Sequence, residues 1–439
     1  MTRENQPAVR WQRGLAPGHE RVDGQLTIAG ISAVALARQY STPLLVIDLD
    51  VLDAAIAEFT KACAPHRIHT AYAAKALLFI ALAQYLRQTA LFLDVCSLGE
   101  LLTAERAGFP AERMYLHGCG KTDDELDAVT AGRVGTVVVD NLEELTRLSK
   151  RARPAAPTRV LLRVNTGIEA HTHAFVQTAG ENTKFGLAST DLKSAARILS
   201  GCAALQFRGL HSHIGSQIYQ ADAFITNARA LMKVAREMHA GGFAVEELVI
   251  GGGFGIQSGP QHDAHLPLAE LFEQVSSGVK DAAREVGMRS PRIGIEPGRA
   301  LIAHAGTSLY RVTTCKNQAS RAFAIVDGGI TDNPRPALYD AYHHALLASR
   351  DSQAQLQNTV VCGRSCENDR LTQALLPSDL REDDLLAVCT TGAYTFSMAS
   401  NYNRFNRPAV VFTQRGEHRL VVKRESVSEL LRNDLTIEV

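Results

Sequence analysis

The stretch His69-Thr70-Ala71-Tyr72-Ala73-Ala74-Lys75-Ala76-Leu77 reads as a short buried strand that ends at a lysine. A lysine is almost never fully buried unless its charge is compensated. A cofactor aldehyde would compensate it by converting the amine into a Schiff base. The alternative is a lysine that starts a helix with its ammonium in water, and this stretch alone favours that alternative. The rest of the chain therefore has to decide.

The same arrangement recurs along the chain: a short apolar run ends at a polar residue or a glycine, and a helical segment follows. The runs are 71–75, 91–94, 113–117, 136–140, 160–165, 207–213, 248–253 and 292–296. Eight strands that alternate with helices over about 230 residues predict a TIM (β/α)8 barrel, an α/β fold. An open doubly wound sheet is the alternative.

The carboxyl ends of these runs favour the barrel. They carry Lys75, Asp94, His117, Asp140, Asn165, His213 and Glu296. In a barrel such ends converge on one mouth, where active sites lie, whereas an open sheet spreads them along an edge. Strand ends are often polar because loops begin there, but this explains a lysine, a histidine and a glutamate less well.

The pattern changes after Leu301, where β-branched segments alternate with turns. These segments are 308–313, 322–326, 359–361, 385–389, 409–413 and 420–423. They predict a second, mostly β domain, and the early strand near Leu26 is expected to join it. The predicted organisation is an N-terminal segment 1–46 that joins the β domain, a barrel 47–303 and a C-terminal β domain 304–439.

Composition excludes several classes of protein. Lysine plus arginine and aspartate plus glutamate number 46 each, so the zero net charge gives no reason to expect nucleic acid or an anionic membrane as a partner. The polar N-terminus lacks a signal-peptide core, and no apolar run approaches the roughly 18 residues of a membrane helix. A soluble cytoplasmic protein is expected.

The eight cysteines include no Cys-x-x-Cys pair, which argues against zinc and a disulfide framework.

A glycine-rich stretch, Gly251-Gly252-Gly253-Phe254-Gly255-Ile256, follows the seventh run. Glycines let backbone N–H groups approach a phosphate closely. The loops after strands seven and eight are the usual phosphate site of a barrel. The spacing differs from the GxGxxG of dinucleotide-binding folds, and a tight turn is the alternative explanation.

The eighth run ends in Glu296-Pro297-Gly298-Arg299. A carboxylate here would keep a pyridinium nitrogen protonated, which makes the ring a strong electron sink. The arginine suits a phosphate or a carboxylate. An ordinary ion pair between the two residues is the alternative.

Histidines occur in two pairs. At the end of the sixth run, His213 would stack on a flat ring and Ser216 would bond a phosphate, although a single core histidine is more often held by a neighbour. His171 and His173 have metal-ligand spacing without a third ligand nearby. We interpret that pair as structural and predict no metal.

Together these pieces resemble the fold type III pyridoxal-phosphate decarboxylases, and within them the diaminopimelate decarboxylase group. The matching pieces are 72–76, 93–97, 169–173, 184–186, 213–218, 251–255, 296–299, 327–329, 335–339, 366–367 and 392–394. Their order and spacing agree from about Pro43 to Leu431. Single pieces are only suggestive, but the set is very specific.

The resemblance implies a cofactor, pyridoxal 5'-phosphate, and a role for each matching residue. Lys75 would bind the cofactor aldehyde, His213 would stack on its ring, and Cys366 would return a proton to the reacting carbon. Cofactor contacts would come from Lys75, Asp94, His213, Ser216, Gly252, Gly253, Glu296, Gly298, Arg299 and Tyr394. Substrate contacts would come from Arg299, Arg335, Tyr339, Glu367 and Tyr394. Arg335 and Tyr339 would hold the distal carboxylate, and Glu367 the distal ammonium.

The reaction implied is decarboxylation of meso-2,6-diaminopimelate to L-lysine. The Cys366-Glu367 loop would reach into a neighbouring subunit, so the resemblance also implies a homodimer with shared active sites. The chain departs from the family pattern at Arg364 and at Asn368-Asp369-Arg370. These departures leave open a sibling decarboxylase that acts on another or a conjugated amino acid. A catalytically dead binding protein and a small cofactor-homeostasis barrel are disfavoured, since the reactive residues and a β domain are present.

Overall fold

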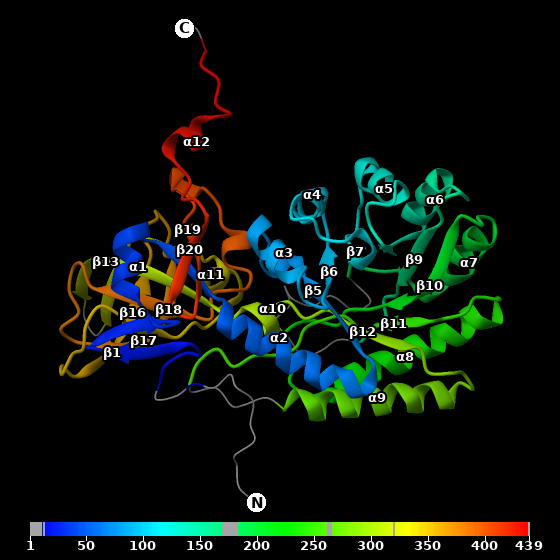
Figure 1. The fold of residues 1–439 in the computed structure, drawn as a ribbon, viewed down its shortest axis with the longest axis horizontal. Coiled ribbons are helices and arrows are strands. Elements are labelled where there is room, and N and C mark those ends of the chain that lie inside the picture. The colour runs from blue at the N-terminus through cyan, green and yellow to red at the C-terminus, as the bar shows by residue number, and fades with distance from the viewer. Residues whose placement is uncertain (1–10, 12–13, 169–182, 261–265, 319–320, 438–439) are drawn as a thin grey trace, which may run out of the picture. The chain divides into compact units, whose positions relative to one another are not determined.

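The computed structural model describes residues 11, 14–168, 183–260, 266–318 and 321–437 (Figure 1). Contacts divide the chain into two compact units. The barrel unit comprises 57–256 and 265–300, and the β unit comprises 1–56, 257–264 and 301–439. The predicted domain boundaries after residues 46 and 303 stay a prediction. The pair His171 and His173 lies outside the described residues.

The barrel unit contains a closed parallel barrel, as predicted. Its strands are β5 (His69–Ala73), β6 (Phe92–Val95), β7 (Met114–Leu116), β8 (Thr136–Val139), β9 (Thr158–Arg163), β10 (Leu205–His211), β11 (Glu247–Val249) and β12 (Arg292–Ile295). Each overlaps one of the eight predicted runs. Inward-facing residues such as Ala71, Val138 and Leu161 fill the barrel interior, so the centre is a packed core.

Helices alternate with these strands. They are α3 (Ile80–Leu86), α4 (Leu98–Arg106), α5 (Asp123–Thr130), α6 (Leu142–Arg151), α7 (Leu192–Ser200), α8 (Ala221–Ala240), α9 (Leu268–Glu285) and α10 (Arg299–Ile302), with α2 (Leu49–Cys63) before the barrel. Side-chain caps start several of them: Ser97, Thr122 and Asn141 each accept a backbone N–H of the first turn. These caps end the strand-to-helix loops abruptly and so fix the residues at the strand ends.

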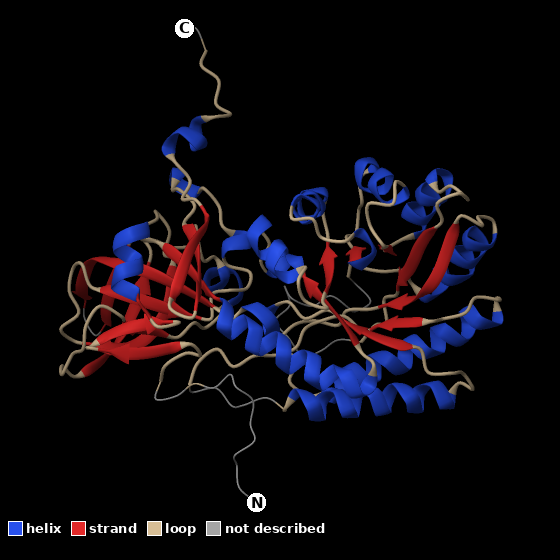
Figure 2. Cartoon of the chain, in the orientation of Figure 1, coloured by secondary structure: helices blue, strands red, loops and turns tan. Residues whose placement is uncertain are grey.

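The β unit is built on strands, which confirms the predicted second domain (Figure 2). Its large sheet contains β4 (Leu44–Asp48), β13 (Gly306–Gln318), β14 (Arg321–Val326), β15 (Ala345–Leu347), β16 (Leu356–Cys362), β17 (Arg370–Pro377), β18 (Leu385–Cys389), β19 (Ala409–Gln414) and β20 (Glu417–Val422). Its helices are α1 (Ala33–Tyr40), α11 (Arg335–Tyr339) and α12 (Val427–Leu431). The early strand Leu44–Asp48 pairs with both β13 and β19.

The segment near Leu26 joins this unit, but as a small sheet of its own. Strands β1 (His19–Val22), β2 (Gln25–Ile28) and β3 (Ile31–Ser32) pair with one another. Leu26 is buried in the same core cluster as Leu309 and Leu385, and its N–H donates to the carbonyl of Ala348 over 2.9 Å. Among the described helices, none has both the length and the apolar character needed to cross a membrane.

Candidate active site

The first candidate residue, Lys75, directly follows β5 in a short 3-10 turn, Ala74–Ala76. Its side chain is exposed, whereas Tyr72 and Ala73 before it are buried. The expectation of a buried strand is therefore met up to Ala74, and the amine itself lies at the barrel mouth. Its positive charge acts on the pKa values of both Asp94 and His213, so the three strand ends converge as predicted.

Glu296 is the centre of the buried polar cluster in this mouth. It follows β12 and lies 3.0 Å from His117 Nε2 through one oxygen and 3.1 Å from His211 Nε2 through the other. Burial would raise its pKa, but the charge and hydrogen bonds of His211 and His117 outweigh burial and hold the pKa of Glu296 well below its usual range. The carboxylate is therefore ionised.

The neighbours of Glu296 complete this cluster. Burial lowers the pKa of His211 to about 4, against the opposing charge and hydrogen bond of Glu296. Burial also raises the pKa of Asp94 to about 6, against the opposing charge of His117, whose Nε2 lies 3.4 Å away. Donor atoms of His117, His211 and Glu296 lie within 4.8 Å of one another. These three side chains therefore have metal-ligand spacing.

His213 lies two residues past the end of β10 and is half-buried. Burial, followed by the charges of Lys75 and Arg163, holds its pKa well below the usual value. The N–H of Gly252 donates to His213 Nδ1 over 3.1 Å, which assigns the ring proton to Nε2. The neutral ring is thereby fixed by the loop after β11.

The glycine-rich loop serves close packing of three neighbouring loops. A Cβ on Gly252 would lie 2.1 Å from the carbonyl oxygen of Glu296, and one on Gly253, whose φ is +94°, would lie 2.2 Å from that of Gly215. Arg299 donates to the Ser216 hydroxyl over 3.3 Å. The structure thus brings Ser216, the glycines and Arg299 together at neighbouring strand ends. Gly298 packs against the Lys75 turn, since its Cβ would lie 3.0 Å from that of Ala76.

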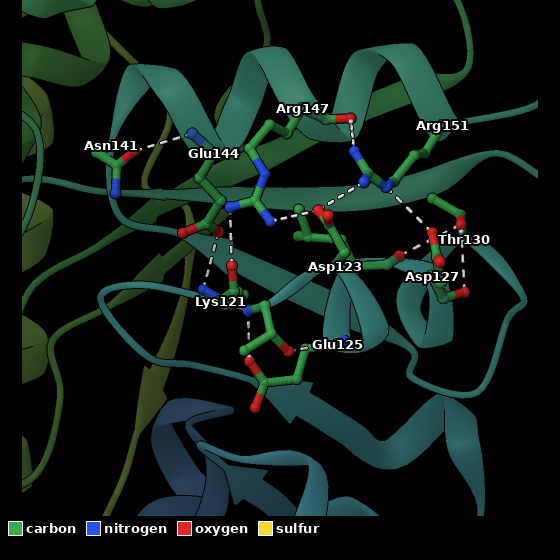
Figure 3. Close-up of polar contacts among 11 residues, drawn as sticks. Lys121, Asp123, Glu125, Asp127, Thr130, Asn141, Glu144, Arg147 and Arg151 are labelled. Carbon is green, nitrogen blue, oxygen red and sulfur yellow. Dashed lines mark hydrogen bonds and ion pairs between the residues drawn. The ribbon is translucent and has the colours of Figure 1, made fainter.

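A buried lysine that the sequence did not single out anchors the loop after β7. Lys121 Nζ donates to the carbonyls of Gly118 and Val138 over 2.8 and 2.7 Å and pairs with Glu144 at 2.8 Å. Figure 3 shows this pair beneath α6, with the Asn141 cap beside it. Since Gly118 directly follows His117, Lys121 fixes the segment that aims His117 at Glu296. Burial is the feature that distinguishes Lys121 from a surface lysine, and burial cannot be read from one sequence.

The other predicted residues belong to the β unit. Arg335, at the start of α11, is 6% exposed. Its guanidinium carbon lies 4.9 Å from the centre of the Tyr339 ring and 5.4 Å from that of Tyr394. The structure therefore brings these three residues together, as an arginine held between two aromatic rings. Tyr394 has a φ of +58°, a left-handed backbone that a non-glycine residue adopts only where its surroundings require it.

Cys366 and Glu367 lie in the loop between β16 and β17, and both are exposed. The N–H of Cys366 donates to Asn403 Oδ1 over 3.0 Å, and Glu367 accepts a hydrogen bond of 2.7 Å from the Tyr402 hydroxyl. The two side chains thus stand at the tip of an anchored loop, presented to solvent in the single chain.

The atypical residues of this loop have partners within the β unit. The Arg364 guanidinium lies 4.3 Å from the centre of the Phe405 ring. Asp369 is buried and accepts from the N–H of Ile330 and the hydroxyl of Ser365. Arg370 pairs with Asp340. These contacts give the departures from the family pattern a local structural explanation.

Comparison with known proteins decides the family. Residues 49–303 match the family model described as pyridoxal-dependent decarboxylase, pyridoxal binding domain. The chain belongs to the pyridoxal-dependent decarboxylases. It is 40% identical to a diaminopimelate decarboxylase of Bacillus subtilis, over 94% of this chain and 95% of that protein. It is 37% identical to the Staphylococcus aureus enzyme of that name, over 94% and 98%.

A solved structure agrees with the fold of this decarboxylase. The crystal structure of diaminopimelate decarboxylase from M. jannaschii in co-complex with L-lysine superimposes with a TM-score of 0.87 at 27% identity. The match covers 95% of this chain and 98% of that one. The resemblance inferred from the sequence motifs is thus confirmed at the level of family and fold.

The barrel mouth of this decarboxylase fits pyridoxal phosphate by its own donor set. An ionised, buried Glu296 suits a protonated ring nitrogen, and the neutral His213 ring suits the face of a flat heterocycle. Ser216, Arg299 and the glycine backbone supply hydrogen-bond donors for a phosphate. The sequence analysis named His117 only as a strand-end residue and did not single out His211, so their shared contact with Glu296 is the addition that the structure makes.

Proposed function

We propose that this protein is a diaminopimelate decarboxylase, which converts meso-2,6-diaminopimelate to L-lysine and CO₂. Two curated relatives of that name align over 94% of the chain, and a related structure of that name holds L-lysine. In this chain the proposal depends most on Arg335. A guanidinium that is buried beside the rings of Tyr339 and Tyr394 suits a substrate with a second carboxylate, because arginine binds a carboxylate through paired charge-assisted hydrogen bonds.

The proposed chemistry assigns one task to each barrel residue. Bound pyridoxal phosphate supplies the electron sink that accepts the electron pair left at the α-carbon when CO₂ departs. Lys75 is the proposed amine for the cofactor aldehyde. Glu296, held ionised by two histidines, would keep a proton on the ring nitrogen of the bound cofactor. His213 supports one face of the ring, with its orientation fixed by Gly252.

The proposed substrate side comes from the β unit and from Arg299. Arg335 and Tyr339 bind the distal carboxylate, Glu367 binds the distal ammonium, and Tyr394 contacts cofactor and substrate. The Cys366 thiol delivers a proton to the α-carbon. Cys366 and Glu367 are exposed in the single chain, and such a thiol needs a covered site to act selectively. This supports a homodimer in which the loop completes the partner's site, and we propose a cytoplasmic location for it.

A substrate comparison tests the proposal. Purified protein with pyridoxal phosphate is assayed for CO₂ release from meso-diaminopimelate, lysine, ornithine and arginine. We expect release from diaminopimelate, with kcat/KM at least about 100-fold above the others, because lysine, ornithine and arginine lack the distal carboxylate that Arg335 is proposed to bind. Release from one of the others but none from diaminopimelate would instead support the sibling decarboxylase. The loop arginines that suggested the sibling already have partners, Phe405 and Asp340.

A further inference from the structure

The barrel has a polar cavity at the amino ends of its strands, at the end opposite to Glu296. Its volume is about 620 Å³, within the range of small-molecule sites. Its lining consists of Phe92, Glu112, Arg113, Tyr115, Thr136, Arg159, Arg208, Glu246, Glu247 and Arg292. Several of these are the first residues of their strands, which places the cavity on the far side of the packed barrel core.

The floor of this cavity is aromatic. The rings of Phe92 and Tyr115 lie 5.7 Å apart, and the His69 ring packs against both, at 5.6 and 6.1 Å. The chain leaves room for this arrangement, because a Cβ on Gly294 would lie 2.5 Å from the His69 ring. A flat apolar group would find matching ring surfaces here.

The floor also contains the carboxylate of Glu247, both oxygens of which have partners within the protein. Glu247 Oε1 lies 2.7 Å from His69 Nε2 and accepts a 2.8 Å hydrogen bond from the Tyr115 hydroxyl. Its second oxygen lies 3.4 Å from Arg292. The negative charge of Glu247 is therefore neutralised within the lining and does not repel an anion.

The rim carries more positive than negative charge. Arg208 pairs with Glu246 at 2.6 Å. Arg113 instead donates to the backbone carbonyls of Arg87 and Thr89, which leaves its charge without a carboxylate among those contacts. Arg159 is exposed, and its guanidinium makes no hydrogen bond or ion pair with the residues that the structure describes.

Arg208 and Arg292 are each paired with a glutamate, so Glu112, which is exposed, is the one remaining carboxylate of the lining against Arg113 and Arg159. An excess of guanidinium groups at the edge of an aromatic floor selects a ligand that is flat and negatively charged.

We propose that this cavity binds a small organic oxyanion with a flat apolar body, an aromatic carboxylate or phosphate. The body lies on Phe92 and Tyr115, and the oxyanion meets Arg159 at the rim. The site is distinct from the proposed active site, because none of its lining residues lies at the carboxyl end of a strand.

The test measures binding to the holoenzyme, whose cofactor occupies the other mouth. Phenyl phosphate and benzoate are titrated by calorimetry, with inorganic phosphate as the probe that lacks a ring. We expect saturable binding of at least one aromatic probe with one site per chain, tighter than inorganic phosphate. Arg159→Gln should raise its Kd about ten-fold, since it removes one charged hydrogen-bond donor. Phe92→Leu should bring the Kd towards that of inorganic phosphate.

Arg236→Gln is the matched control, since Arg236 is an exposed arginine of the same unit outside the cavity. Its Kd should stay within two-fold of wild type, and all three variants should keep the wild-type kcat. Absence of saturable binding by either aromatic probe would overturn the proposal. So would equal Kd values in Arg159→Gln and Arg236→Gln, whatever the outcome of the decarboxylase assay.

Discussion

At the scale of single residues, the properties of the site depend on which side chains contact one another. Glu296 is an ordinary carboxylate in the sequence, and its low pKa follows from two imidazoles, one on each oxygen. Both histidines are buried, and each lies at the end of another barrel strand: His117 follows β7 and His211 ends β10. An electron sink of this type depends on an ionised carboxylate at the ring nitrogen, so the two histidines serve as positioning residues for the proposed chemistry.

The first prediction concerns that charge. Glu296→Gln keeps the shape of the side chain but removes the negative charge, so no carboxylate remains to stabilise the protonated form of the ring nitrogen. We expect kcat for CO₂ release to fall by about 100-fold or more, while cofactor absorbance and the melting temperature show that a folded holoenzyme remains. Glu237→Gln, an exposed glutamate on α8, should leave kcat unchanged. Wild-type turnover in Glu296→Gln would refute the assigned role.

A second residue-scale prediction concerns acid stability. His19 is buried, its Nε2 lies 2.8 Å from the Thr307 hydroxyl, and burial followed by the charge of His344 lowers its pKa to about 4. The folded state therefore prefers the neutral ring. The stability from this preference is fully present above the unfolded pKa of 6.5, and it is lost as the pH falls towards about 4.

The experiment isolates His19 from the buried aspartates that titrate in the same range. Urea unfolding of wild type and His19→Gln is compared between pH 7.5 and pH 4. The stability advantage of wild type should shrink by up to about 3 kcal/mol on acidification. An advantage that is constant with pH would show that His19 has an ordinary pKa in the folded protein.

At the scale of elements, buried polar anchors set the loops that carry the site. Lys121 and Glu144 are 3% and 2% exposed, and they tie the loop after β7 to the start of α6. Burial raises the pKa of Glu144, which the charge of Lys121 opposes. A pair of this kind is costly to break from one side, because the remaining charge is left buried and unpaired.

We therefore predict that Lys121→Met lowers the free energy of unfolding by about 3 to 5 kcal/mol, measured by urea denaturation. The double variant Lys121→Met/Glu144→Leu should recover part of that loss, because no buried charge remains. Arg151→Gln breaks the ion pairs with Asp123 and Asp127, two exposed aspartates of the neighbouring helix, and should cost less than about 1 kcal/mol. Equal losses in the buried and exposed variants would contradict the anchoring role of Lys121.

The elements also show what a single sequence reveals. The barrel strands were predictable because each apolar run ends at a polar residue that begins a loop, as Asp140 does after β8. β15 and β17 were both missed, although β15 has three residues and β17 has eight, so strand length does not explain these two misses. The meeting of His211 with Glu296, 85 positions apart, depends on barrel closure and has no local signal. The burial of Lys121 has no local sequence signal either, since it follows from tertiary packing.

At the scale of the whole molecule, the residues that the proposed function assigns to the reaction are divided between the two units of the chain. Lys75 and Glu296 come from the barrel unit, and Cys366 and Glu367 come from an exposed loop of the β unit. Asp369 holds that loop through Ile330 and Ser365, so its tip is rigidly supported although it is exposed. A site shared between two subunits requires an exposed segment that carries reactive side chains and is held in place by its own subunit, as this loop carries Cys366 and Glu367.

This sharing gives the last prediction. Lys75→Ala and Cys366→Ala should each be nearly inactive as homodimers, the first with no visible cofactor absorbance and the second with it retained. If each site takes Lys75 from one subunit and Cys366 from the other, a mixed dimer contains one site with both residues intact. Random exchange makes half of the dimers mixed, so about a quarter of the wild-type activity per site should return. Activity that stays at the level of the parents, after subunit exchange has been demonstrated by mass, would place both residues of a site on one chain.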